Sequence, residues 1–141
     1  MKYRRRALVA ILLGLCMITE SIFAHHGYAD RYDEENPITL DGVVLELQLI
    51  NPHAAIIFQV TSEDGEVVRW SGYLGSATTL ARTEGWTKDT LKPGDRITIF
   101  GAGATNGAPD ILLARASRIT MTDTGEEIKN SLSRGIGGRG F

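Results

Sequence analysis

Hydrophobic residues that recur at every second position constrain the fold of this chain most. Between residues 38 and 50, Val43, Leu45, Leu47 and Leu49 fall on one side of an extended chain and Val44 falls on the other. A period of two is typical of a β-strand with one buried face. The same kind of pattern predicts four further strands, over residues 53–61, 66–73, 96–100 and 111–121.

Turn and cap residues separate the predicted strands. Asp64-Gly65 is a favoured hairpin turn, and it joins the second and third strands. Ser76 can cap the first turn of a short helix that ends near Gly85, because the period of the pattern changes there. Residues 91–95 form the turn that leads into the fourth strand.

The order of these elements predicts an all-β domain with one short helix. Three strands, a helix and two more strands follow the order of an OB-like barrel, a five-stranded, partly open Greek-key closure. A plain β-sandwich is the competing architecture, but it needs about seven strands. The 117 residues that follow position 24 are enough to bury a hydrophobic core without disulfides.

The first 24 residues have the three parts of an export signal. A basic start is followed by about eleven apolar residues, and Ala24 closes a cleavage site. Because the apolar run is too short to span a bilayer comfortably, we predict cleavage after Ala24. The mature protein is then periplasmic or secreted and has no membrane span. An uncleaved N-terminal anchor and a lipoprotein modified at Cys16 are the alternatives.

Composition divides the chain into a signal peptide (1–24), an N-terminal arm (25–37), the barrel domain (38–123) and a flexible, glycine-rich tail (124–141). The formal net charge of −2 combines +3 in the signal with −5 in the remainder. A negative mature protein without a basic stripe does not favour nucleic acid, whose phosphates dominate binding. We expect a periplasmic protein or a small molecule as the partner.

Three histidines carry the chemistry that the sequence suggests. Cleavage after Ala24 makes His25 the first residue, so that its α-amino group and its imidazole can chelate one metal ion. His26 adds a second imidazole, and His53 adds a third if the arm folds back over the second strand. Nitrogen-rich ligation suits Cu(II), with zinc and nickel next. We therefore predict a copper site at His25, His26 and His53.

Other interpretations of the same residues stay open. Two adjacent histidines at a chain end can simply be solvated, and the ring of His53 can bind a backbone carbonyl at the start of a strand. Cleavage removes Cys16 and leaves Met121 as the one mature methionine, so thiolate and methionine-rich sites are excluded. A binding protein is favoured over an enzyme, and no catalytic residue is predicted, although an amine–histidine copper site could also activate oxygen.

Aromatic residues offer a second type of site that needs no metal. Trp70, Tyr73 and Trp86 could line a ligand surface on the barrel, as aromatic residues do in OB folds. The competing interpretation makes Trp70 and Trp86 anchors of the core. A metal-independent ligand- or protein-binding OB module is therefore the alternative to a copper protein.

Several short motifs of this chain occur together in one known family. They are His25-His26-Gly27-Tyr28, Asp33, Pro37, Leu40-Asp41-Gly42-Val43, Asn51-Pro52-His53, Gly85-Trp86-Thr87 and Leu91-Lys92-Pro93-Gly94-Asp95. Taken together they resemble a family of small exported bacterial proteins of unknown function. The resemblance covers about residues 24–123 and includes the Ala-His-His start of the mature chain.

The resemblance implies a periplasmic OB-like domain and no particular activity. It places His25, His26 and His53 at motif positions of the family, which favours a joint role for them. This chain differs from the family at Ala54-Ala55, where other members often have a branched residue and a tryptophan. An aromatic group that could stack on His53 is therefore missing here.

Overall fold

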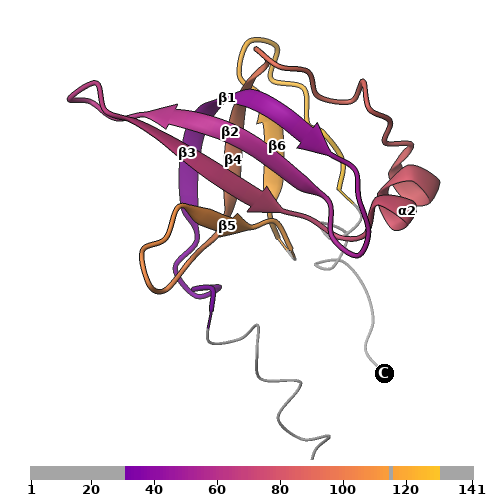
Figure 1. Cartoon of the computed structure of the whole chain (residues 1–141), viewed down its shortest axis with the longest axis horizontal. Helices are drawn as coiled ribbons and strands as arrows, with labels where there is room; N and C mark the ends of the chain where they lie inside the picture. Colours follow the sequence, from indigo (N-terminus) through magenta and orange to yellow (C-terminus); the bar gives the residue numbers. More distant parts are fainter. Residues whose placement is uncertain (1–30, 115, 131–141) are drawn as a thin grey trace, which may run out of the picture. The chain divides into compact units, whose positions relative to one another are not determined.

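The computed structural model describes residues 31–114 and 116–130. In this part the strands form one sheet, and a helical segment lies between the third and fourth of them (Figure 1). The strands are β1 (Ile38–Gln48), β2 (Ala55–Thr61), β3 (Val67–Tyr73), β4 (Arg96–Gly103), β5 (Asp110–Leu112) and β6 (Arg118–Met121). The predicted signal peptide and the first part of the predicted arm lie outside the described residues.

Pairing of β1 with two neighbours closes the sheet into a barrel. β1 runs antiparallel to β4 over Ile38–Val43 and antiparallel to β2 over Val43–Gln48. β2 pairs with β3, β3 lies parallel to β5, and β5 runs antiparallel to β4, which completes the ring. The prediction of an all-β, OB-like barrel is confirmed, and the described strands pair all the way round instead of leaving the ring partly open.

A β-bulge in β1 interrupts the alternation that the sequence suggests. The register with β2 shifts just after Val44, so that Leu45 is the extra residue. Val44 is buried as a result, whereas Leu45 is 38% exposed. The prediction that Leu45 lies on the same face of the strand as Leu47 is therefore wrong, because one inserted residue reverses the facing of the side chains before it. Leu47 and Leu49, beyond the bulge, do pack against the core.

The turn of residues 91–95 holds β1 beside this bulge. The N–H of Gly94 donates to the carbonyl of Val44 over 2.8 Å, and the N–H of Val44 donates to the carbonyl of Asp95 over 2.9 Å. Gly94 has a φ of +95°, which favours glycine, and the Asp95 carboxylate accepts from the N–H of Lys92 over 2.7 Å. The turn and the bulge therefore fix each other's position.

Aliphatic side chains and one phenylalanine fill the barrel interior. Phe58 on β2 is fully buried and stacks against Trp70 on β3, with ring centroids 6.5 Å apart. The other large buried side chains are Ile56, Leu80, Leu91, Ile97, Ile99, Ile111, Leu113 and Ile119. Each buried side chain of this size stabilises the fold by about 1.5–3 kcal/mol relative to an exposed one, so this cluster provides most of the driving force for folding.

The helical segment between β3 and β4 begins and ends at the predicted residues. The hydroxyl of Ser76 accepts from the N–H of Thr79 over 3.1 Å and caps the first turn of α2 (Ala77–Thr79). The segment continues as a π-helix, η2 (Leu80–Glu84), and ends at Gly85, whose φ is +72°. The serine cap and the glycine end therefore behave as the sequence predicts.

The predicted fifth strand, residues 111–121, is interrupted in the structure. β5 and β6 both run antiparallel to β4, but their registers differ by four residues. In the turn between them, the N–H and the hydroxyl of Ser117 both donate to the carbonyl of Ala114, over 3.1 and 2.6 Å. Ala116 has a φ of +61°, which costs an L-residue about 1–2 kcal/mol. The prediction of one continuous strand is wrong, because hydrophobic alternation does not reveal an inserted turn.

Residues beyond position 123 continue to contact the barrel. Thr120 forms an antiparallel bridge with Glu127, and the N–H of Ile128 donates to the carbonyl of Ile119 over 2.8 Å. Asn130 is buried, and its Nδ2 donates to the Ser117 hydroxyl over 3.0 Å. The described part of the predicted flexible tail is therefore packed on the domain.

Gly42 lies one residue before β1 begins to pair with β2, and we expect Gly42→Ala to destabilise the barrel. A Cβ at this position would lie 2.7 Å from the carbonyl oxygen of Gln59 and 2.7 Å from Cδ2 of Phe58. Overpacking of this kind costs about 1–3 kcal/mol in the free energy of unfolding, which urea denaturation measures. Thr39→Ala, at an exposed site of the same strand, should stay within about 0.5 kcal/mol of the parent. Equal stability of the two variants would contradict the close approach of Gly42 to Gln59 and Phe58.

Candidate functional site

His53 lies in the loop between β1 and β2, and hydrogen bonds hold this loop on both sides of the histidine. Asn51 Nδ2 donates to the hydroxyl of Thr78 over 3.1 Å, and the N–H of Thr78 donates to Asn51 Oδ1 over 3.4 Å. The N–H of Ala54 donates to the carbonyl of Gly75 over 2.9 Å. His53 itself is exposed. The loop therefore presents an imidazole at a defined place on the surface.

The other two predicted copper ligands, His25 and His26, lie outside the described residues. Within residues 31–114 and 116–130, no three His, Cys, Asp or Glu side chains gather in a group that could hold a metal ion. The three-histidine site therefore stays a prediction.

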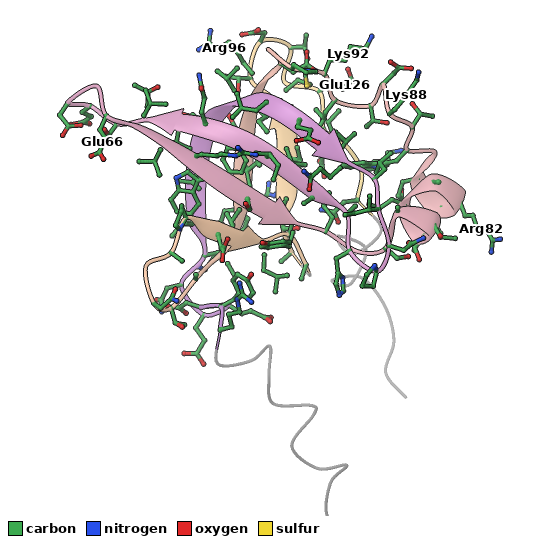
Figure 2. The ribbon with its side chains drawn as sticks, viewed as in Figure 1. Glu66, Arg82, Lys88, Lys92, Arg96 and Glu126 are labelled. Atoms are coloured by element: carbon green, nitrogen blue, oxygen red, sulfur yellow. The ribbon has the colours of Figure 1, made fainter. Side chains whose placement is uncertain are left out.

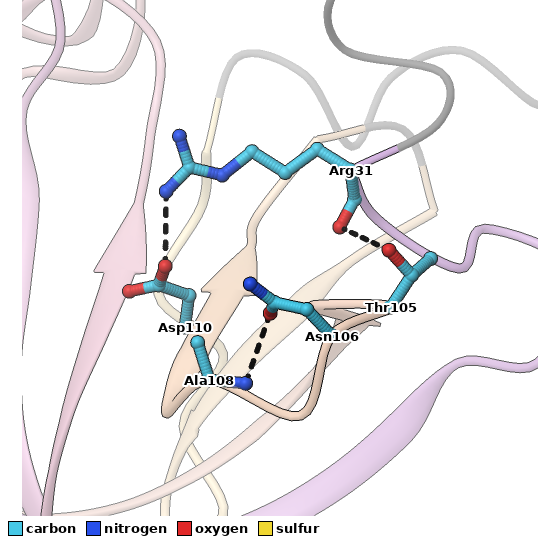
Figure 3. Close-up of polar contacts among 5 residues, drawn as sticks. All are labelled: Arg31, Thr105, Asn106, Ala108 and Asp110. Atoms are coloured by element: carbon cyan, nitrogen blue, oxygen red, sulfur yellow. Dashed lines mark hydrogen bonds and ion pairs between the residues drawn. The ribbon is translucent and has the colours of Figure 1, made fainter.

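The first described residues attach the start of the domain to the loop between β4 and β5 (Figure 3). The guanidinium of Arg31 donates to the Asp110 carboxylate over 3.0 Å, and this hydrogen bond raises the pKa of Arg31 above its ordinary value. The carbonyl of Arg31 accepts from the N–H of Thr105 over 2.9 Å. Tyr32 follows, buried, in a bridge with Ala104. These contacts fix the point at which the arm joins the barrel.

A turn built around the Asp33 carboxylate follows. This carboxylate accepts a hydrogen bond from the side-chain amide of Asn36, whose shorter contact is 3.0 Å. It also accepts one from the backbone N–H of Asn36 over 3.0 Å. The N–H of Glu35 donates to it over 3.2 Å. These bonds, the Asn36 side chain first, lower the pKa of Asp33 because they favour the charged form. The turn leaves Glu34 exposed at its centre.

The three aromatic residues predicted for a ligand surface do not lie on one surface. Trp70 pairs with the buried Phe58 and lies on the inner side of β3, whereas Tyr73, three residues on, lies on the outer side. Trp86 is 4% exposed, and its indole N–H donates to the carbonyl of Lys129 over 2.6 Å. The structure thus places Trp70 and Trp86 with the core and leaves Tyr73 alone on the outer face.

A polar hollow on the outer face of β1 and β2 was not predicted from the sequence. It has a volume of about 230 Å³, and Asp41, Gln59, Thr61 and Arg96 are among its lining residues. The Asp41 carboxylate accepts from the hydroxyl of Thr98 over 2.6 Å. These residues come from different strands, so no local motif marks the hollow in the sequence.

Charged side chains of both signs surround the described barrel. Figure 2 shows Glu66 at the β2–β3 hairpin, Arg82 on the helical segment and Arg96 at the start of β4, each pointing away from the barrel. Arg96 lies 3.5 Å from the Asp123 carboxylate, and exposed pairs of this type contribute about 1 kcal/mol or less. No helix in the described ranges is long and apolar enough to cross a membrane.

Comparison with protein families identifies a match over most of the chain. The model of a family of unknown function, DUF6152, matches residues 13–112. The chain belongs to DUF6152. The DUF6152 match contains all three histidines and the strands from β1 to β5. No curated protein and no solved structure matches the chain.

The bonds to Asp33 predict a pH-dependent contribution to stability. Because the pKa of Asp33 is lower in the folded protein than in the unfolded chain, its contribution is complete above the unfolded value of about 4. It is lost as the pH falls through the lower, folded value. Titration of the Asp33 carboxyl carbon by NMR should show this low pKa, and Asn36→Ala should raise it toward the ordinary value. The control Asn106→Ala should leave it unchanged, and an unshifted pKa in the parent would contradict the turn.

The contacts of Trp86 predict a role in stability. Trp86→Phe removes the donor to the Lys129 carbonyl and leaves a small cavity, so we expect a loss of about 1–3 kcal/mol in thermal or urea unfolding. Trp70→Phe, at a partly exposed position, should cost less. A Trp86→Phe variant of parental stability would contradict the core role of this indole.

Proposed function

We propose that the chain is an exported binding protein that holds one Cu(II) ion. The α-amino group and imidazole of His25 and the imidazoles of His26 and His53 are the ligands. The observation that carries the proposal is the exposed position of His53 in a loop held by Asn51 on one side and Ala54 on the other. A ligand on a held backbone loses little conformational entropy when the metal binds.

The remaining ligands are assigned to the arm for a chemical reason. In the described part of the chain no cluster of three ligand-type side chains includes His53. The two other histidines of the sequence are adjacent at positions 25 and 26. Three imidazoles and one amine form the nitrogen-rich set that Cu(II) binds more tightly than the other divalent first-row ions.

The length of the arm supports the proposal. Asp110, which binds Arg31, is level with Ser71 on the neighbouring strand, and His53 lies about four residues further along the sheet. With two strand spacings, the separation between Asp110 and His53 is roughly 16 Å. The five residue steps from Arg31 back to His26 can span about 17 Å in an extended chain. Two imidazole side chains add their own length, and this reach must also cover the Arg31 side chain, whose guanidinium is the group that contacts Asp110.

Export is part of the proposal, because the amine ligand exists only after cleavage behind Ala24. A residue retained before His25 would convert its amine into a peptide nitrogen, and the chelate formed by the amine and the imidazole of His25 would be lost. The basic start, the short apolar segment and the small residue at position 24 support this processing.

The proposal predicts one tight Cu(II) site on residues 25–141, measured by calorimetric titration of the processed protein. His53→Ala should weaken binding by at least about tenfold, because loss of even an outer partner of a metal site costs 10–100-fold. Ile50→Ala, at a 59% exposed position of the same loop, is the matched control and should bind copper like the parent.

Two results would overturn the proposal. If His53→Ala binds Cu(II) as tightly as the parent, the ion is held by the chain terminus alone and the barrel contributes no ligand. If mass spectrometry of the exported protein shows a first residue other than His25, the amine chelate does not form. Far-ultraviolet circular dichroism of each variant verifies that the fold is intact.

A further inference from the structure

An apolar hollow lies on the outer face of β4 and β5, and the proposed copper site does not use it. Its volume is about 210 Å³, and its apolar lining includes Phe100, Ala102, Leu112 and Ala114. Among the lining residues that the structure describes, Glu34 is the charged one. We infer that this hollow receives a lysine side chain of a partner protein. The aliphatic part of the lysine lies in the hollow, and its ammonium group pairs with Glu34.

The hollow exists because the strand that follows β4 is interrupted. The registers of β5 and β6 on β4 differ by four residues, and the turn that takes up this difference has Ala114 at its start and Ser117 at its end. Ala114 and Ala116 on this turn, and Ala102 on β4, are too small to fill the space beside Phe100. Ala116 has a φ of +61° in this turn, and strained backbone conformations of this kind are concentrated at binding sites.

The size and the walls of the hollow favour a single side chain over a whole small molecule. Pockets for small molecules usually measure about 300–1,000 Å³, which is more than this hollow offers. The guanidinium carbon of Arg118 lies 5.7 Å from the centroid of the Phe100 ring, so this ring already attracts one cation. Lysine combines a four-carbon apolar stem with a terminal charge, and it commonly buries the stem while the charge stays near water.

The charge at the rim has the sign that a lysine needs. Glu34 is exposed, and it takes part in neither of the ion pairs formed within the described residues. The bonds from Glu35 and Asn36 to Asp33 hold the turn that carries it. Asp33 and Glu35 flank it and add to the negative potential. An ammonium group at this rim therefore gains a carboxylate partner at the open end of an apolar hollow.

NMR titration of the ¹⁵N-labelled protein, residues 25–141, tests the inference with two matched probes. Nα-acetyl-lysine methylamide should give saturable shifts at the amides of Gly101, Ala102, Leu112 and Ala114. Nα-acetyl-norleucine methylamide, which has the same stem without the charge, should bind at least about fivefold more weakly, since an exposed ion pair contributes up to about 1 kcal/mol. Equal binding of both probes, or no saturable shift at tens of millimolar, would overturn the inference.

Variants distinguish binding in the hollow from general electrostatic attraction to the acidic residues 33–35. Glu34→Gln should lower the affinity for the lysine probe by about fivefold. Glu35→Gln makes the same change of charge beside the hollow and should change the affinity by less than about twofold. Ala102→Leu should abolish binding by filling the hollow, and Ala114→Val serves if that variant does not fold. Equal effects of the two glutamate variants would overturn the inference.

A last comparison tests the source of the ammonium group. A glycine-flanked lysine peptide should bind at least as tightly as free n-butylamine. Tighter binding of the free amine would overturn the assignment to a protein partner. These results do not depend on copper, so failure of the copper proposal and failure of this inference can be told apart.

Discussion

The barrel depends on a pair of backbone hydrogen bonds between Val44 and the turn of residues 91–95. They lie at the point where β1 leaves β4 and joins β2, beside the extra residue Leu45. A strand that serves two neighbours must bend sharply, and a bulge supplies both the bend and the stronger twist. Without this change of partner the sheet would keep two free edges, and the core around Phe58 would be open on one side. The loop that carries His53 follows the same strand, so the candidate metal ligand depends on the same closure.

Features that arise from local chemistry could be predicted from the sequence. Ser76 and Gly85 mark the ends of the helical segment, because a serine cap and a left-handed glycine act within one turn of chain. The inserted turn between Ala114 and Ser117 could not be predicted, because it is revealed only by how β5 and β6 pair with β4. The same holds for the hollow next to Phe100, whose walls come from segments that are distant in sequence.

At the candidate site, too, local features could be predicted from the sequence and contacts between distant segments could not. The exposed position of His53 is consistent with the Asn51-Pro52-His53 motif. The hydrogen bond from Asn51 to Thr78 could not be predicted, because nothing in the sequence identifies Thr78 as its partner. Other residues of the motifs have structural tasks: the turn at 91–95 holds the bulge, and Trp86 binds the chain at Lys129. His53 is exposed, and the copper proposal assigns it a chemical role. Trp70 and Tyr73 are close in sequence, yet the period of a strand puts them on opposite faces.

Pulsed electron paramagnetic resonance of the processed protein, loaded with one equivalent of Cu(II), distinguishes an ion bound by His53 from one held by the chain terminus alone. Nitrogen modulations from the remote ring nitrogens count the imidazoles that bind the metal, independently of affinity. Three coordinated imidazoles are expected in the parent and two in His53→Ala, with the fold intact in both. A parent spectrum that already shows two or fewer, and that does not change in His53→Ala, would contradict it.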